Sequence, residues 1–312
     1  MNLQYVTIIG SYNVGLFLKG EKLPSMGETV IGDQFYEGGG GKGSNQAVAA
    51  SLFGAKTCFI GRVGFDKYGQ DALAMYKRLG IDFSTITVDP SIHSGISVIL
   101  IDAYGHNLIS VVPGANFKLS IEDIIAAKGA LAESCVVGFQ LENQLEVIDP
   151  AIRKVHEMGI MTFLDPAPAR PLPDDLYPCI DIIKPNETEA TILTGKEVTG
   201  PASAEEAGCW FLDHGVKTAI ITLGEQGSTL VSRDGIDHFY PPKVKALDTT
   251  GAGDIFAGAF LTALWQGRSI RDAIVFANHA AAISTTRLGV IDAIPSVDEV
   301  LESVKTAELP YP

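Results

Sequence analysis

The alternation of short apolar runs with longer helix-like runs constrains the fold of this 312-residue chain more than any other feature. Strands are expected at Tyr5–Ile9, Thr57–Gly61, Cys135–Phe139, Met161–Leu164, Ile180–Ile183 and Thr218–Thr222. Helices are expected at Gly43–Phe53, Tyr68–Leu79, Ile121–Leu131, Glu146–Glu157, Asn186–Thr194 and Ala202–His214. Alternation at this spacing predicts a doubly wound α/β fold, in which helices cover both faces of a mostly parallel central sheet.

Two regions depart from this alternation. Glu28–Tyr36, and Ser94–Asp102 followed by Leu108–Val112, have β character without intervening helices. We expect them to form a small β-sheet lid, built from about residues 12–36 and 94–112, on a single α/β domain spanning 1–312. The last third of the chain is helical instead, with helices expected at Asp254–Gln266, Ser269–Thr286 and Val297–Val304.

The charge balance narrows the classes of partner. The formal net charge is −14, which disfavours nucleic acid and anionic membrane, because both require clustered Lys and Arg. An anionic ligand must then be held by local dipoles or by a metal ion. No apolar run approaches the roughly 18–20 residues that span a membrane. The four cysteines are scattered, so we expect free thiols and a cytoplasmic protein.

The glycine-rich stretch YEGGGGKGSNQAVAA, from Tyr36 to Ala50, suggests phosphate binding but fits neither common phosphate-binding motif. A Walker A loop needs Gly where Tyr36 stands and Ser or Thr where Gly43 stands. A dinucleotide fingerprint needs G-x-G-x-x-G directly after the first strand, but that strand runs into Gly10-Ser11-Tyr12-Asn13. A nicotinamide dehydrogenase is therefore set aside.

A second glycine-rich stretch, LDTTGAGDIFAGAFLTAL from Leu247 to Leu264, carries the strongest chemical signal. A strand-like run, Val244–Leu247, leads through the turn Gly251-Ala252-Gly253 into a helix, whose first N–H groups suit an anion. Asp254 stands in the first helical turn. It is either an acid that favours the helix dipole, worth ~0.3–1 kcal/mol, or a general base for an attacking hydroxyl, which phosphoryl transfer requires only late in the reaction.

Four motifs in order resemble those of the ribokinase-like (PfkB) carbohydrate kinases, over essentially the whole chain. They are GGKGSNQAVAA, the run Lys184–Glu189 (KPNETE), the run Ile221–Gly227 (ITLGEQG) and DTTGAGDIF. Within that family, GGKGSNQAVAA, PAPAR and PNETEA are most similar to ribokinases. The resemblance implies ATP-dependent phosphorylation of a primary hydroxyl on a pentose or related small sugar, and a homodimer formed through the lid.

The resemblance also implies roles for individual residues. Sugar would be bound by Asn13, Gly40, Gly41, Lys42, Asn45 and Glu142, with Asp254 as catalytic base and Gly251, Ala252 and Gly253 as anion hole. ATP would be bound by Asn186, Thr222, Gly224, Gly227 and Asn278. Mg²⁺ would be held through water by Asn186 and Glu189, and a monovalent cation such as K⁺ by Asp248, Thr250, Thr285 and Gly289.

Simpler interpretations compete with three of these assignments. Asn186 and Glu189 have the spacing of a helix N-cap with a capping box, an alternative compatible with metal binding. Lys42 is otherwise a solvated lysine, and Glu142 an acid at a helix N-terminus.

Two positions depart from the ribokinase pattern. Gly15 stands where an aspartate usually binds sugar hydroxyls, and Asp165 stands where ribokinases usually have Asn. We expect Gly15 to remove a hydrogen-bond acceptor and leave space, so that the sugar is not ribose. The substrate would be a sugar that is larger than ribose, lacks a hydroxyl or carries another group near that position. Asp165 has no explanation from sequence.

Two other classes of function compete with a pentose kinase. The first is a kinase for a nucleoside, ketose or other sugar derivative on the same fold. The second is a non-catalytic sugar or nucleotide sensor, against which the intact Asp254 and G-A-G turn argue.

Overall fold

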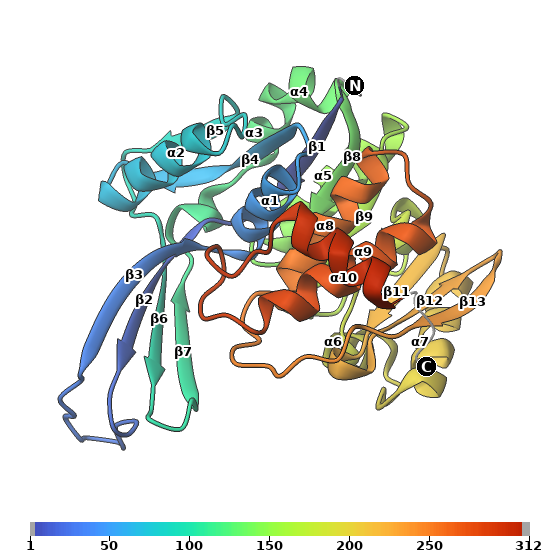
Figure 1. Cartoon of the computed structure of the whole chain (residues 1–312). Coiled ribbons are helices and arrows are strands. Elements are labelled where there is room, and N and C mark those ends of the chain that lie inside the picture. Colours follow the sequence, from blue (N-terminus) through green and yellow to red (C-terminus); the bar gives the residue numbers. More distant parts are fainter. Residues whose placement is uncertain (1–3, 308–312) are drawn as a thin grey trace.

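The computed structural model describes residues 4–307, and a nine-stranded sheet forms its centre (Figure 1). The strand order is β13-β12-β11-β10-β9-β8-β1-β4-β5. All pairings from β5 to β11 are parallel, and β12 and β13 add two antiparallel strands at one edge. The strands are β1 (Tyr5–Ile9), β4 (Thr57–Gly64), β5 (Ile86–Asp89), β8 (Ser134–Phe139), β9 (Met161–Leu164), β10 (Ile182–Ile183), β11 (Thr218–Thr222), β12 (Ser228–Ser232) and β13 (Gly235–Phe239).

Helices cover both faces of this sheet, as predicted. One face packs against α1 (Lys42–Leu52), α2 (Lys67–Arg78), α8 (Ala252–Trp265), α9 (Ile270–Ser284) and α10 (Val297–Ala307). The other packs against α3 (Ile121–Ala126), α4 (Lys128–Ala132), α5 (Leu145–Glu157), α6 (Glu187–Thr194) and α7 (Pro201–Asp213). Each face has its own buried apolar cluster, because successive strand residues point to opposite sides. Within residues 4–307, none of the helices is both long and apolar enough to cross a membrane.

The second, smaller sheet contains β2 (Asn13–Lys19), β3 (Gln34–Gly40), β6 (Gly95–Ile101) and β7 (Asn107–Val112), in the order β3-β2-β6-β7. It extends away from the helical layers (Figure 1). β3 begins six residues later than the expected run from Glu28 and includes Gly38–Gly40. These glycines pair with β2, where Asn13 lies opposite Gly40 and Gly15 opposite Gly38.

Two expected elements are wrong in detail. The single helix expected at Ile121–Leu131 is divided into α3 and α4 at Ala127, and Gly129, a poor helix former, lies in the second piece. Val244–Leu247 is an irregular segment with exposed side chains at Val244 and Leu247 rather than a strand. Its backbone is fixed instead by a hydrogen bond from the Leu247 N–H to the Thr285 carbonyl (2.7 Å).

The sheet topology locates the site. β1 pairs with β8 on one side and with β4 on the other, so the connections after β1 and β8 diverge. Ligands of doubly wound sheets bind at the carboxyl ends of strands beside such a switch point. Three adjacent strands of this sheet end there in polar residues: Gln140 follows β8, Asp165 follows β9 and Lys184 follows β10.

Candidate active site

Asp254 is fixed in the first turn of α8 by the glycine turn before it. Gly251 has φ 75°, and a Cβ there would lie 2.4 Å from Val290 Cγ1, so the tight entry into the helix requires glycine. The Ala252 N–H donates to the Thr249 carbonyl (3.2 Å), which closes the turn. Asp254 is the third residue of α8, and it is only 4% exposed.

The other glycine-rich stretch brings α1 against the same carboxylate. Asn45 Nδ2 donates to Asp254 Oδ2 (2.8 Å), and Gln46 Nε2 donates to Oδ1 (3.3 Å). This close approach depends on Gly43, where a Cβ would lie 2.7 Å from the Gly10 Cα. The structure therefore joins the predicted residues Asn45 and Asp254. Sequence reasoning missed Gln46, although it follows Asn45 in the same motif.

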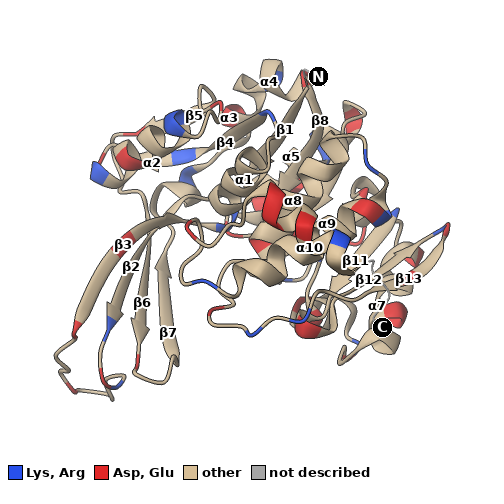
Figure 2. Ribbon diagram, in the orientation of Figure 1, with Lys and Arg blue, Asp and Glu red and all other residues tan. Residues whose placement is uncertain are grey.

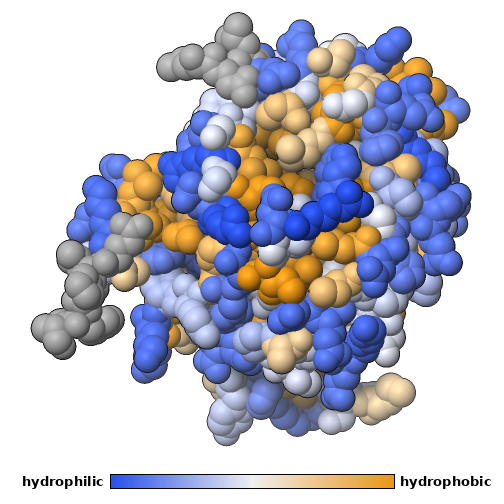
Figure 3. Space-filling model, turned by 90° about the vertical axis from the view of Figure 1, so that its right-hand side faces the viewer, coloured by the Kyte–Doolittle hydropathy of each residue, from blue (hydrophilic) through white to orange (hydrophobic). Residues whose placement is uncertain are grey.

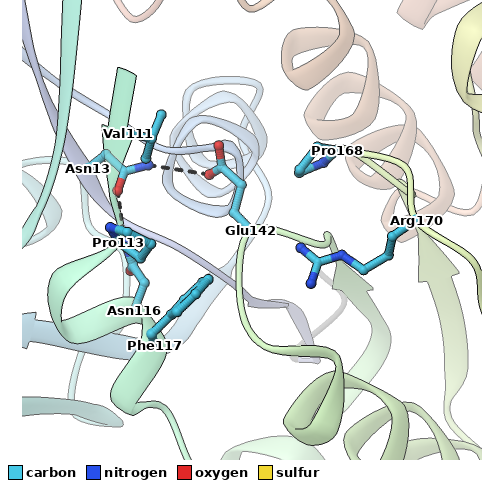
Figure 4. Close-up of a pocket in the computed structure, with 8 residues that line it drawn as sticks. All are labelled: Asn13, Val111, Pro113, Asn116, Phe117, Glu142, Pro168 and Arg170. Carbon is cyan, nitrogen blue, oxygen red and sulfur yellow. Dashed lines mark hydrogen bonds between the residues drawn. The ribbon is translucent and has the colours of Figure 1, made fainter. Parts of the chain in front are cut away.

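The predicted sugar residues Asn13 and Glu142 line one pocket of about 180 Å³, between the small sheet and the main sheet (Figure 4). Glu142 Oε2 accepts hydrogen bonds from Ser11 Oγ and from the backbone N–H of Lys42 (2.9 Å). It also accepts from Asn13 Nδ2 (3.4 Å), whose Oδ1 accepts from Asn116 Nδ2 (2.8 Å). Glu142 thus faces the pocket, and the N-cap of α5 is Gln144.

Other pocket residues were not predicted. Arg170 points toward the pocket from the side opposite Asn13, and its guanidinium donates to the Leu141 carbonyl (Figure 4). Asn116 and Phe117 contribute from the short helix after β7. Asn116 also accepts from the Tyr12 N–H (2.9 Å), so it links this helix to the start of β2. No motif marks Asn116 or Phe117, and Arg170 was quoted only as part of PAPAR.

Lys42 lies close enough to the carboxylates of Asp254, Asp165 and Glu142 to interact with their charges. Gly41, which precedes it, has φ 89°, and a Cβ there would lie 2.7 Å from the Asn13 N, so Lys42 follows a close backbone contact with β2. The Asp254 carboxylate, and after it those of Asp165 and Glu142, raises the pKa of the half-buried Lys42 ammonium above its ordinary value. Lys42 is therefore a half-buried lysine near acidic side chains, and its role in sugar binding stays a prediction.

Asn186 and Glu189 form the capping box of α6. Asn186 Oδ1 accepts from the Glu189 N–H (2.8 Å), and Glu189 Oε2 accepts from the Asn186 N–H (2.8 Å). The interpretation of this spacing as a helix N-cap with a capping box is therefore confirmed, and metal binding by this pair stays a prediction.

The predicted nucleotide residues lie around the end of β11. Thr222 ends β11 and forms a bridge with Asn186, and the turn that follows contains Gly224 and Gly227. Gly227 has φ 91°, and a Cβ there would lie 2.0 Å from the Phe239 oxygen. Asn278 in α9 is buried, and its Nδ2 donates to Ser228 Oγ (3.0 Å) and to the Phe239 carbonyl (3.3 Å).

The four predicted cation ligands also come together. Asp248 Oδ1 accepts from the Thr250 N–H (2.9 Å), and Oδ2 accepts from the Gly289 N–H (3.1 Å). The Thr285 carbonyl accepts from the Asp248 N–H (3.0 Å). The structure thus gathers these residues into one loop cluster in which the Asp248 oxygens already accept backbone hydrogen bonds.

Gly15 does not leave the empty space expected from sequence. A Cβ at this position would lie 2.6 Å from Cε2 of Phe17, whose ring covers the glycine. Phe17 is in turn stacked on Tyr36 of β3, with ring centroids 4.5 Å apart. An apolar ring therefore occupies the place beside Gly15.

Asp165 is half of a buried ion pair. Its Oδ1 lies 3.1 Å from Nζ of Lys184, and both side chains are almost fully buried. Burial raises the pKa of the Asp165 carboxyl, and the Lys184 ammonium opposes that rise. The sequence motif contained Lys184, but no role was predicted for it.

Comparisons with known proteins agree with these motifs. A family model described as pfkB family carbohydrate kinase matches residues 3–297. The chain is 39% identical over 297 residues to a ribokinase of Staphylococcus aureus, covering 95% of this chain and 98% of that protein. It is 35% identical over 304 residues to a deoxyribokinase of Salmonella typhi, covering 97% and 99%. The structure of Arabidopsis thaliana ribokinase complexed with ribose and ATP is similar with a TM-score of 0.88 at 29% identity, covering 97% and 99%.

Proposed function

The chain belongs to the pfkB family of carbohydrate kinases, and from this we propose that it transfers the γ-phosphoryl group of ATP to a primary hydroxyl of a pentose or related small sugar. One observation carries the proposal. Asp254 lies at the start of α8, and the amides of Asn45 and Gln46 orient its carboxylate. A hydroxyl beside it can lose its proton while a phosphoryl group approaches the helix N-terminus.

The proposed mechanism assigns one step to each part of the site. Asn13 and Glu142 bind sugar hydroxyls in the pocket next to the small sheet, and the backbone of Gly40, which pairs with Asn13, and of Gly41 contributes beside it. Asp254 accepts the proton of the attacking hydroxyl. The amides of Gly251, Ala252 and Gly253 donate to the transferred phosphoryl oxygens, and the Lys42 ammonium offsets the negative charge of the surrounding carboxylates.

The residues present fit the cofactors that the family resemblance implies. Thr222, Gly224 and Gly227 at the end of β11, with Asn278 in α9, would hold ATP. Mg²⁺ keeps most of its waters, and Glu189 suits it because only one carboxylate oxygen is used in the capping box. The chemistry that Mg²⁺ would supply, held near Glu189, is neutralisation of charge on the phosphates. Asp248 and the carbonyls of Thr250, Thr285 and Gly289 form an all-oxygen set suited to K⁺.

The small sheet acts as the lid of this site and as the contact between two subunits in the proposed function. Its strand β7 exposes the apolar side chains of Leu108, Ile109, Val111 and Val112. Closure of such a lid excludes water and favours transfer to the sugar over hydrolysis. An exposed apolar strand is also suited to pairing with a second copy of the chain.

An ADP-release assay over pentoses, deoxypentoses, ketoses and nucleosides, with and without K⁺, tests the proposal. We expect sugar-dependent ADP release with at least one pentose or deoxypentose. Turnover restricted to nucleosides or ketoses would reassign the substrate within the family. Sugar binding without turnover, measured by calorimetry, would identify a sensor and contradict the kinase proposal.

A further inference from the structure

Three neighbouring strands end in a row of buried polar side chains beneath Asp254. Lys184 follows β10, Asp165 follows β9 and Gln140 follows β8, and these strands are adjacent in the sheet. All three side chains are buried. Polar groups removed from water in this way require partners, and a buried ion pair requires more than its own attraction to offset its loss of hydration. The contacts of these three side chains therefore show which part of the site they hold in place.

Gln46 connects this row to the proposed catalytic base. Its Oε1 accepts from Gln140 Nε2 (2.6 Å), which fixes the amide orientation. Its Nε2 then donates to Asp165 Oδ2 (2.8 Å) and to Asp254 Oδ1 (3.3 Å). An amide nitrogen has two N–H groups, so each carboxylate takes one of them. The orientation of Asp254 is thereby tied to the position of Asp165.

Lys184 provides a second connection to the same helix turn. Its Nζ lies 3.1 Å from Asp165 Oδ1 and donates to the Gly253 carbonyl (3.3 Å), the residue directly before Asp254. One ammonium group thus contacts the partner acid and the backbone of the proposed anion-binding turn. A pair that served only to hold β9 beside β10 would not need this contact with α8.

The ion pair of Asp165 and Lys184 adds no net charge near Asp254 as long as both members are present. The two carboxylates that share the Gln46 nitrogen lie within about 6 Å of each other, where like charges disfavour joint ionisation. Lys42 in α1 and Lys184 after β10 supply positive charge, and Glu142 after β8 and Glu189 in α6 add further negative charge. Loss of one member of the ion pair changes the charge that Asp254 experiences in a defined direction.

We propose that Asp165 and Lys184 are positioning residues for the phosphoryl transfer: through Gln46 and the Gly253 carbonyl, the pair orients Asp254 and the turn that receives the phosphoryl group. This role depends on the proposed function of Asp254. Asp165, which stands where ribokinases usually have Asn, is thus paired with a lysine that compensates for its charge.

Three variants test this role: Lys184→Met, Asp165→Asn and the double variant, which is uncharged at both positions. Lys184→Met removes a positive charge close to Asp254, so the acid limb of the kcat–pH profile moves to higher pH. Asp165→Asn removes that charge and leaves the lysine, so the acid limb moves to lower pH. Opposite shifts of this kind do not arise from partial unfolding, which lowers the whole profile.

In the double variant, the melting temperature should recover while kcat stays low. We expect its melting temperature to return close to that of the unmodified chain, because neither member of the pair is left buried without its partner. Its kcat stays about tenfold or more below normal, with an unchanged KM for sugar, since the contact with the Gly253 carbonyl is lost. Lys184→Arg, which retains the charge, recovers part of kcat.

The ion pair between Lys217 and Asp181 is the control, because these residues precede β11 and β10, at the end of the sheet away from Asp254, and Lys217 is exposed. Lys217→Met is expected to leave kcat and the pH profile unchanged. Recovery of both melting temperature and kcat in the double variant, with no pH shift in either single variant, would overturn the positioning role. Failure of the unmodified chain to turn over any sugar would instead refute the proposed function.

Discussion

Asp254 shows how one carboxylate is held by sequence motifs that lie far apart in the chain. Its hydrogen-bond partner Asn45 is 209 positions away in sequence, yet the two side chains are 2.8 Å apart. The acid is buried, and the helix N-terminus and two amide donors favour its negative charge. A carboxylate placed in this way accepts a proton without any change of conformation in the surrounding residues.

Replacing Asp254 with Asn is predicted to lower kcat by ~10²–10⁴ while the KM for sugar changes little, because a positioned base contributes that much to proton transfer. Steady-state kinetics with the best sugar of the panel measures both quantities. Asp272→Asn is the matched control, since Asp272 also stands in the first turn of a helix, α9, but is exposed and accepts from Ser269. Near-normal turnover in Asp254→Asn would refute the assignment of the base.

Gly15 is predicted to limit the use of ribose. Gly15→Asp should raise kcat/KM for ribose, because the carboxylate restores an acceptor for sugar hydroxyls. The new side chain must displace the Phe17 ring, so Gly15→Asp combined with Phe17→Ala should gain more than Gly15→Asp alone.

Gly38→Asp controls for the added charge, because Gly38 lies opposite Gly15 and a Cβ there meets nothing within 4 Å. If the unmodified protein prefers ribose over every other pentose and deoxypentose, the inference from Gly15 is wrong.

The sequence identified the residues that carry a recognisable local pattern. Asp254 and Asn45 belong to glycine-rich motifs, and both reach the site. Gln46 lies in the same motif as Asn45, and Lys184 begins the KPNETE motif, but the roles of both depend on which strands are neighbours, and no local pattern encodes that order. Phe17 was missed because no strand was predicted at Asn13–Lys19, and only in a strand do Gly15 and Phe17 share a face.

At the level of elements, the packing of α1 against α8 determines the geometry of the site. Each helix begins after a positive-φ glycine, Gly41 for α1 and Gly251 for α8. The two helices approach closely because Gly258 has no side chain: a Cβ there would lie 2.5 Å from Ala49 Cβ and 2.8 Å from the Gln46 oxygen. The contact between Gly258 and Ala49 therefore controls the distance from Asn45 to Asp254.

Gly258→Ala is predicted to separate these helices. Overpacking of a buried contact costs about 1–3 kcal/mol, which urea unfolding measures. We also expect kcat to fall in the folded protein, because the Asn45–Asp254 hydrogen bond lengthens. Gly129→Ala in α4 is the control: a Cβ there meets nothing within 4 Å, and the change should be neutral or stabilising. Equal stability of the two variants would show that the α1–α8 contact has room for a methyl group.

Elements with a strong pattern were predicted well, and those that depend on tertiary context were not. β1, β9 and β11 have the predicted bounds, because each is a short apolar run that becomes buried on both faces. Val244–Leu247 has similar residues but pairs with α9 through one carbonyl rather than with a strand. β12 and β13 were overlooked because each has only two large apolar residues, in STLVS and GIDHF, which is too short a run to indicate a strand.

At the scale of the whole molecule, charge and apolar surface are distributed unevenly. Charged residues are spread over the helical layers, whereas the strands of the small sheet are mostly uncharged (Figure 2). The face turned away from the small sheet has hydrophobic residues near its centre, surrounded by hydrophilic ones (Figure 3). The small sheet differs, because along β7 every residue is exposed and four of the six are large and apolar.

The exposed strand β7 leads to a prediction about assembly. Ile109 is 58% exposed and Val111 is 46% exposed, and both lie on the same face of the strand. An uncharged strand with this much apolar surface is stabilised by covering it with another chain, so we expect a dimer of the 33.1 kDa chain in sedimentation experiments.

Ile109→Asp with Val111→Asp should give monomers, since two buried charges would oppose the contact. Ile236→Asp on β13 adds a charge to a comparably exposed residue outside the small sheet and should leave the dimer intact. A monomer at all concentrations of the unmodified chain would contradict assembly through the lid. A dimer that survives the double substitution would assign the contact to another surface.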